Sequence, residues 1–266
     1  MGKMKKEKEM VKKKNIRAQV TIFIILALAI VVVLALLFIR RGDIIPISTA
    51  QVSPVYQIKT CMSDAVKQEL DFIASQGGSL NPDNYFMHEG NKLQYLCYSS
   101  EYYEPCVMQK PMLKQDIEKE LTDSTKDKIL ACISVIKDSL ENKGYTVKYD
   151  APEIKIELVL NSVVISADNI NMEISKSNTE TYKTIKTEIS SKMYEFVMIA
   201  SSISNLEAHY GNSETMIYMT YYPSLKVQKI PQSEGTRVYI LSNSDTKEKF
   251  MFASRSMTYP VGVTGE

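Results

Sequence analysis

The four cysteines are the residues of this chain with the most clearly defined chemistry. They are Cys61, Cys97, Cys106 and Cys132, and four cysteines allow three disulfide pairings. Cys97 and Cys106 enclose only eight residues, which favours a local bridge. Cys61 and Cys132 fall on the apolar faces of two expected helices, whose packing could bring their Cα atoms within the ~4.4 to 6.8 Å that a disulfide requires. We therefore predict the pairs Cys97–Cys106 and Cys61–Cys132.

The segment closed by the first of these bridges is rich in tyrosine and glutamate. It reads CYSSEYYEPC, and its candidate partner-binding residues are Tyr98, Glu101, Tyr102, Tyr103 and Glu104. Tyrosine offers a large amphipathic surface at low entropic cost, and loops held on rigid scaffolds often carry function. We predict contacts with a partner protein or a sugar here. The alternative is that these rings shield the base of their own loop.

Motifs for catalysis or metal binding are absent from the sequence. The two histidines, His88 and His209, do not flank the cysteines at zinc-finger intervals, and no nucleophile elbow, phosphate-binding glycine loop or zinc-protease motif occurs. Asp116, Glu118 and Glu120 alternate with lysines, as on a solvated helix face. We predict a non-enzymatic protein without metal or cofactor. A pair of carboxylates that only folding brings together, as in glycosidases, leaves an anchored hydrolase open.

The charges of the chain are unevenly distributed. The totals of 32 basic and 31 acidic side chains give a net charge of +1, but residues 1–17 carry +6, Arg40 and Arg41 carry +2, and residues 42–266 carry −7. An acidic remainder of this size repels phosphates, so we expect no nucleic-acid partner.

Residues 20–39 form an apolar run in which only Thr21 is polar. As a helix, twenty residues cross the ~30 Å hydrocarbon core of a membrane. We therefore predict a cytoplasmic basic segment at 1–17 and a transmembrane helix at 18–41 that contacts the lipid bilayer. The positive-inside rule places the N-terminus in the cytoplasm and the C-terminal domain outside the cell membrane, where disulfides persist.

A cleaved secretory signal is the alternative, with residues 48–50 as its small-residue site. However, the apolar run exceeds the usual ~7 to 15 residues of a signal core, and Arg40, Arg41 and Pro46 intervene. A retained anchor is favoured.

The junction before the apolar run carries a more specific pattern. Lys12, Lys13 and Lys14 precede the residues Arg-Ala-Gln-Val-Thr at 17–21, which resemble the class III signal of archaeal type IV pilins. The resemblance implies that a prepilin peptidase cuts between Ala18 and Gln19. Phe23 stands where the pilin pattern has Glu.

The whole layout is also similar to that of uncharacterised archaeal single-pass surface proteins, which share the Gln-Val-Thr-Ile-Phe start and a Gln-Gly-Gly segment, here at 76–78. That resemblance implies no known activity.

Beyond the apolar run, the patterning indicates an α+β domain with two to three amphipathic helices and antiparallel strands. We expect a spacer at 42–54, then a helical lobe at 55–144 that includes a hairpin, a helix ended by the glycines 77–78, and a second helical region broken near 122–124. We expect an antiparallel sheet at 145–266 with one long helix at 179–210. The tail should return to strands, the first of them at 216–221, so that Tyr218, Tyr221 and Tyr222 would lie partly in the core.

These features together predict a single-pass surface protein with pilin-like topology, which acts through protein contacts or self-association. An anchored binding module that does not polymerise is the alternative, and an anchored hydrolase is the third hypothesis.

Overall fold

The computed structural model of the chain describes residues 25–32 and 53–258 and divides the chain into two compact units, Met1–Val52 and Ser53–Glu266. In the first unit, residues 25–32 are helical and exposed. The rest of the predicted span at 18–41, the basic segment, the cleavage site Ala18–Gln19 and most of the spacer lie outside the described residues. Among those that are described, no helix is long and apolar enough to cross a membrane.

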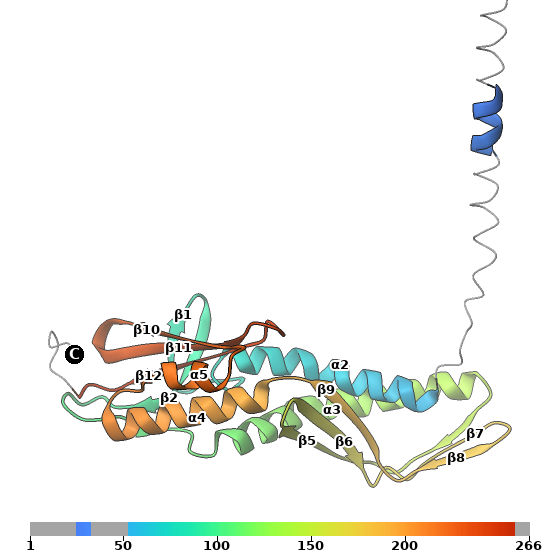
Figure 1. Cartoon of the computed structure of the whole chain (residues 1–266). Helices are drawn as coiled ribbons and strands as arrows, with labels where there is room; N and C mark the ends of the chain where they lie inside the picture. The colour runs from blue at the N-terminus through green and yellow to red at the C-terminus, as the bar shows by residue number, and fades with distance from the viewer. Residues whose placement is uncertain (1–24, 33–52, 259–266) are drawn as a thin grey trace, which may run out of the picture. The chain divides into compact units, whose positions relative to one another are not determined.

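Two antiparallel helices, α2 (Pro54–Ser75) and α3 (Leu113–Asn142), lie side by side in the second unit (Figure 1). Proline suits the first turn of α2 because it needs no amide partner there. Apolar residues spaced three and four apart bury one face of each helix: Ile58, Met62, Val66, Leu70 and Ile73 in α2, and Ile117, Leu121, Ile129 and Ile133 in α3.

The predicted break near residue 123 is wrong, because α3 is continuous. The hydroxyl groups of Thr122 and Thr125 donate to carbonyl oxygens one turn earlier, at 2.7 Å each. These polar side chains are therefore satisfied inside the helix and do not interrupt it.

The segment Gln76-Gly77-Gly78 ends α2 and fits closely between neighbouring elements. Both glycines have a positive φ, 75° and 90°. A Cβ at Gly78 would lie 2.9 Å from side-chain carbons of Leu113 and Ile117. This segment therefore has a packing role, which is sufficient to explain its glycines.

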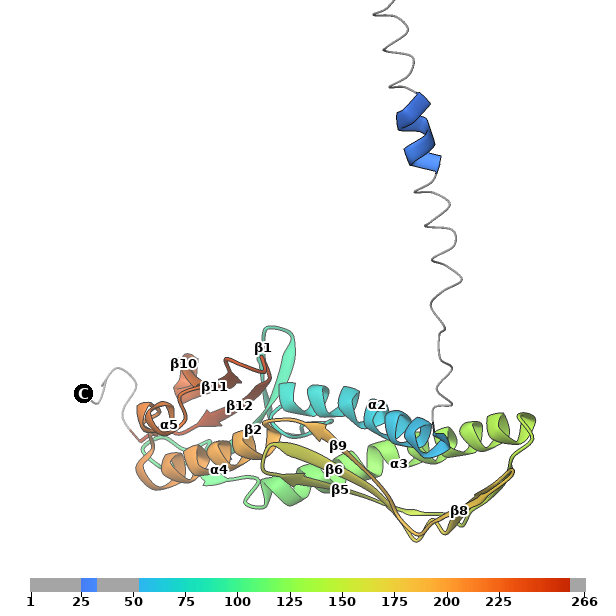
Figure 2. The ribbon, with the colours of Figure 1, turned by 45° about the vertical axis from the view of Figure 1, so that its right-hand side comes forward.

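A bent three-stranded ribbon covers part of the helix pair. Its two halves are the sheet β4 (Thr146–Lys148), β7 (Met172–Ser175), β8 (Thr179–Tyr182) and the sheet β5 (Glu153–Val159), β6 (Ser162–Asp168), β9 (Ile185–Ser190). The pairing of β4 with β7 continues without a register shift into that of β5 with β6. The bend, visible in Figure 2, lies where Asn169 and Asn171 adopt positive φ. Strand β9 contacts α2, and β5 contacts α3.

The remaining strands form one sheet, which combines the first three strands of the domain with its last three. Its order is β1 (Tyr85–His88), β2 (Asn91–Tyr98), β12 (Lys249–Arg255), β11 (Thr236–Asn243) and β10 (Leu225–Pro231), with β3 (Val107–Met108) beside β2. The β2–β12 pair is parallel, and the other pairs are antiparallel. Because β2 lies beside β12, this sheet combines strands from both predicted segments, 55–144 and 145–266. The α+β class with antiparallel sheets is confirmed.

The predicted long helix at 179–210 is wrong in its first half. Residues 179–190 form β8 and β9, and only α4 (Met193–Tyr210) is helical. It begins where Ser191 Oγ accepts the Met193 amide, at 3.1 Å. It ends, as expected, at Gly211, which has φ 69°. The buried face of α4 packs against the sheet strands β2 and β12 (Figure 1).

The predicted strand at 216–221 is instead the short helix α5 (Met216–Tyr221). The Glu214 carboxylate accepts the Met216 amide at 2.9 Å and begins the turn. The tyrosine spacing at 218, 221 and 222 fits a helix as well as a strand, and α5 contacts the edge strand β10. None of the residues of α5 is buried.

Candidate functional site

The cysteines pair as the sequence predicts. Cys97 and Cys106 are bridged with their Cα atoms 5.4 Å apart, and Cys61 and Cys132 with their Cα atoms 6.5 Å apart. The second bridge joins α2 to α3. The first joins the end of β2 to the residue before β3, and so closes the loop at 97–106, which we call the disulfide loop.

The backbone of the disulfide loop is fixed to the last residue of β12 and to the residues that follow it. Ser99 N–H donates to Arg255 O at 2.9 Å, and Tyr103 N–H donates to Met257 O at 2.6 Å. The Cys106 amide donates to Ser256 Oγ at 3.2 Å. The disulfide and these three hydrogen bonds to the C-terminal segment together hold the backbone of the loop in place.

Four of the five predicted binding residues point outward. Tyr102 is 52% exposed and Tyr103 is 65% exposed. Glu101 and Glu104 are exposed, and their carboxylates have no hydrogen-bond or ion-pair partner within the described residues. The loop therefore presents two aromatic rings between two free negative charges.

Tyr98, the fifth residue, belongs to the base of the loop. Its ring lies 5.0 Å from that of Tyr95 and 5.5 Å from the Arg255 guanidinium, measured between centres. Burial raises the pKa of Tyr95, whose hydroxyl group is 3.0 Å from Thr236 Oγ1. Tyr98 therefore shields the base of the loop, whereas Tyr102 and Tyr103 face outward.

Arg255 connects the disulfide loop to a second loop. Its guanidinium donates to Ser99 O at 2.5 Å and to Glu234 O at 3.0 Å. Glu234 is exposed and places a third carboxylate near this surface. The sequence gives no sign of this neighbour, because 135 positions separate Ser99 from Glu234.

A second candidate surface is an uncharged groove between α4 and α5, which we call the aromatic groove. Its volume is about 650 Å³. The residues that line it are Met198, Ile199, Ser202, Leu206, Ile217, Tyr218, Tyr221 and Tyr222. Tyr221 is 75% exposed, whereas Tyr218 packs partly against the core and lies 2.8 Å from Ser202 through their hydroxyl oxygens. The expectation that Tyr221 and Tyr222 lie partly in the core is wrong, because Tyr221, the last residue of α5, and Tyr222, which follows it, are both exposed.

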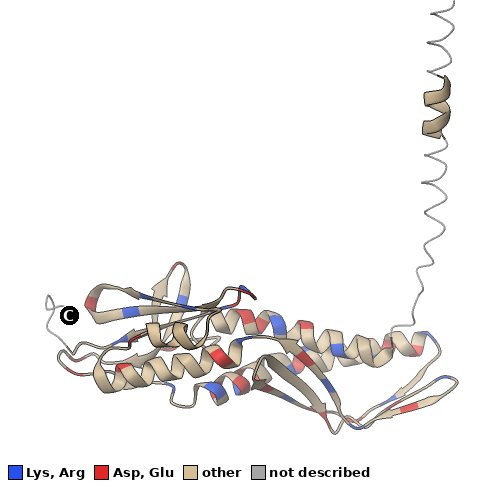
Figure 3. Ribbon diagram, in the orientation of Figure 1, with Lys and Arg blue, Asp and Glu red and all other residues tan. Residues whose placement is uncertain are grey.

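Two of the carboxylates that alternate on α3, those of Glu118 and Glu120, accept backbone amides of neighbouring segments and so help to hold the fold together. Residues of both signs are interspersed along α2 and α3 (Figure 3). Glu118 pairs with Lys114 at 2.5 Å and accepts the Leu158 amide at 2.7 Å. Glu120 accepts the Leu80 amide at 2.6 Å. These two residues are partly buried, so the predicted solvated face is wrong for them.

A buried charged cluster lies at the end of α4. Glu207 is fully buried and accepts hydrogen bonds from the Tyr239 hydroxyl group and, at 2.5 Å, from Arg237 Nη1. Burial also lowers the pKa of Lys229, which donates to Ser213 O at 3.1 Å. These four residues have partners within the protein and do not line the aromatic groove, so we assign the cluster to the stability of the fold.

No group of three metal-ligating side chains occurs within residues 25–32 and 53–258. His88 and His209 lie on separate elements, β1 and α4. No protein-family model, characterised protein or solved structure matches the chain.

Proposed function

We propose that this chain is a single-pass membrane-anchored surface protein of pilin-like topology, whose extracytoplasmic domain acts through contacts with other proteins and carries out no catalysis. The observation that carries this proposal is the disulfide loop, which presents Tyr102 and Tyr103 on a backbone fixed from both sides. Exposed aromatic rings on a rigid support are typical of protein-binding surfaces.

The backbone of Tyr103 supports a binding role. Its φ is 67°, in the left-handed region, which costs a bulky residue about 1 kcal/mol or more and costs glycine almost nothing. For the stability of the fold alone, glycine would be the more favourable residue at position 103. A ring that is 65% exposed contributes little to the core, so its value lies in contacts outside the chain.

The disulfides support an extracytoplasmic location for the domain. Two bridges join all four cysteines of the sequence, and such bridges persist in oxidising compartments. The basic block at 1–17 and the apolar run at 20–39 supply the corresponding orientation and anchor.

Site-specific cross-linking in whole cells tests the protein-contact proposal. A photoreactive residue at Tyr102 should give adducts that disappear in the Tyr103→Gly variant, because glycine keeps the backbone conformation and removes the ring. A matched control places the same residue at Val135, which is 67% exposed on α3. Equal adducts from both positions, or adducts unaffected by Tyr103→Gly, would contradict the role of the loop.

The pattern of adducts separates filament from receptor. A ladder of multiples of this chain indicates self-assembly, whereas one discrete band with a foreign protein indicates an anchored binding module that does not polymerise. Phe23, at the position of the pilin glutamate, favours the second outcome.

N-terminal analysis of the membrane-bound protein tests the pilin-like processing. A mature chain that begins at Gln19 supports cleavage after Ala18. An intact first residue refutes it and leaves the anchor without processing.

A further inference from the structure

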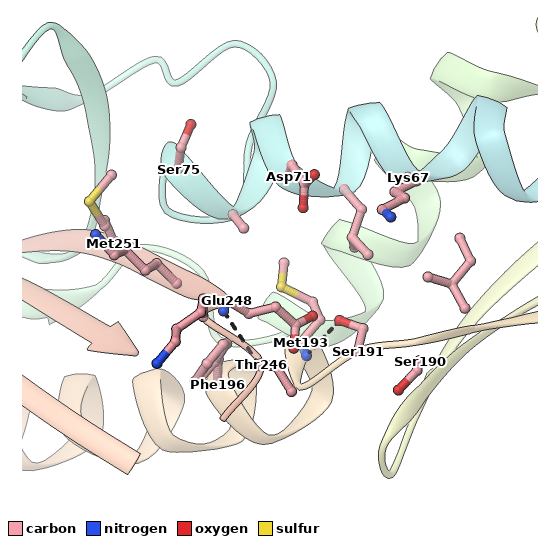
Figure 4. A pocket seen from close by; sticks show the side chains of 15 residues that line it. Lys67, Asp71, Ser75, Ser190, Ser191, Met193, Phe196, Thr246, Glu248 and Met251 are labelled. Carbon is pink, nitrogen blue, oxygen red and sulfur yellow. Dashed lines mark hydrogen bonds between the residues drawn. The ribbon is translucent and has the colours of Figure 1, made fainter. Parts of the chain in front are cut away.

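A cleft opens where four segments of the chain meet, and it lies apart from the disulfide loop. Its walls are α2, the junction between β9 and α4, the turn between β11 and β12, and β12 itself (Figure 4). Its volume is about 660 Å³. Clefts of ~300 to 1,000 Å³ are the usual size for small-molecule sites.

Part of the cleft lining is apolar. It is formed by Leu70, Ala74, Ile189, Met193, Phe196 and Met251. Phe196 and Met193 are buried in α4, and Leu70 is buried in α2. A ligand in this cleft would therefore place an apolar body against rigid, already packed side chains.

The positive end of α4 points into this region but is already satisfied by the chain. The Lys192 amide donates to both carboxylate oxygens of Glu248, at 3.0 and 3.2 Å. The Met193 amide donates to Ser191 Oγ at 3.1 Å, the bond drawn beside these residues in Figure 4. Glu248 and Ser191 thus already bind the amides at the N-terminus of α4, where the helix dipole favours negative charge.

Several polar groups of the cleft have no bonding partner among the described residues. Lys67, Lys249 and Asp71 have no hydrogen-bond or ion-pair partner among residues 53–258. Ser191 is 96% buried, and its hydroxyl oxygen accepts from Met193 while its own proton is left free to be donated. Lys247 donates to Ser244 O at 2.5 Å.

The lysines make the cleft more positive than the domain that contains it. Its three lysines, at 67, 247 and 249, outnumber its two carboxylates, Asp71 and Glu248, whereas residues 42–266 as a whole carry −7. Since Glu248 is engaged by the α4 amides, its charge is already partly compensated.

We propose that this cleft binds a small amphipathic anion, with a carboxylate or phosphate group on a compact apolar body. The anionic group contacts Lys67 and Lys249 and accepts a hydrogen bond from the Ser191 hydroxyl group. The apolar body packs on Leu70, Met193 and Phe196. The aromatic groove offers apolar surface but lacks the first requirement, because it has no charged lining residue.

Calorimetric titration of the full chain in non-ionic detergent tests this assignment with defined probes. Phenyl phosphate and benzoate should both bind, and their relative affinities show which anionic group the cleft prefers. Inorganic phosphate, which lacks the body, should bind roughly ten-fold more weakly than phenyl phosphate, because it buries no apolar surface. Phenyltrimethylammonium, with a ring but the opposite charge, should not bind.

Charge variants locate the binding. Lys67→Gln and Lys249→Gln should each weaken phenyl phosphate binding roughly two- to five-fold, while Asp71→Asn should strengthen it by removing a repulsive charge. Lys226→Gln is the matched control, since Lys226 is an exposed lysine on β10 without a partner in the described residues and lies outside the cleft.

Two results would overturn the proposal. One is the absence of binding by either aromatic anion at millimolar concentration. The other is equal affinity in the wild type and in all the cleft variants, which would place the anion elsewhere. Unchanged thermal melting of the variants confirms that a lost affinity reports binding, because the three substituted side chains are exposed and not bonded.

Discussion

Removal of the Glu207 carboxylate should strongly destabilise the domain at residues 53–258. Glu207 lies near the end of α4 with 0% exposure and accepts hydrogen bonds from Arg237 and Tyr239 of β11. In Glu207→Ala, Arg237 keeps only Gly211 O as an acceptor, at 2.9 Å, and the buried Tyr239 hydroxyl group loses its acceptor. The Arg237 side chain keeps 19% exposure, so the loss combines an ion pair that is buried on the Glu207 side with an unsatisfied buried hydroxyl group, and we expect it to cost about 3 kcal/mol.

Urea unfolding followed by circular dichroism measures this loss. The matched control is Glu195→Ala on the same helix, where Glu195 pairs with Lys192 at 3.0 Å and both side chains keep at least 20% exposure. A partly exposed pair three residues apart contributes about 0.5 kcal/mol. The two variants should therefore differ several-fold in their loss of unfolding free energy.

A triple variant separates the charge from the packing. Glu207→Leu with Arg237→Met and Tyr239→Phe removes all three polar side-chain groups together, so none of the three is left without its partner. We expect it to recover most of the stability lost in Glu207→Ala. A cost of Glu207→Ala no greater than that of Glu195→Ala would refute the assignment of this cluster to the stability of the fold.

Three further predictions concern the same domain. Burial raises the pKa of Tyr239 far above its usual range; above about pH 10 the unfolded chain loses this phenol proton while the folded chain keeps it, so unfolding free energy should fall by up to ~1.4 kcal/mol per pH unit. Alkaline unfolding titrations should show a shallower fall in Tyr239→Phe, and equal slopes would contradict this. Gly211→Ala should lower the melting temperature, because φ is 69° and a Cβ would collide with Thr258; an unchanged melting temperature counts against that packing. Replacement of both Cys61 and Cys132 by Ala opens a bridge that spans 71 positions and should cost about 4 kcal/mol in urea unfolding, on the loop-entropy account; no loss would rule that account out here.

The disulfides and α2 were predictable because their signals are local or strictly periodic. Cys97 and Cys106 are nine positions apart, which limits how far they can separate. In α2, the spacing of Ile58, Met62 and Val66 matches one helix face over several turns. Such patterns depend on residues that are close in the sequence and not on contacts with distant segments.

The strands at 179–190 were not predictable from the same kind of pattern. Ile185 and Ile189 are four residues apart, a separation that places both on one face of a helix and equally on one face of a strand. In the structure this segment is a strand, because β9 pairs with β6 along the residues from Ser162 to Ala167. That partner is a tertiary contact, and it overrides the local ambiguity.

The two proposed sites differ in the same respect, because one is local in the sequence and the other is assembled from distant segments. The disulfide loop could be found from sequence because a single stretch of ten residues contains its rings, its charges and the bridge that closes it. The cleft could not, because its two uncommitted lysines, Lys67 and Lys249, are 182 positions apart and approach the same space only when β12 lies beside α2. Since neither lysine needs the other for folding, no local pattern marks them. A site assembled in this way is revealed by groups that the fold leaves without partners, and the charge variants at Lys67, Asp71 and Lys249 test that criterion directly.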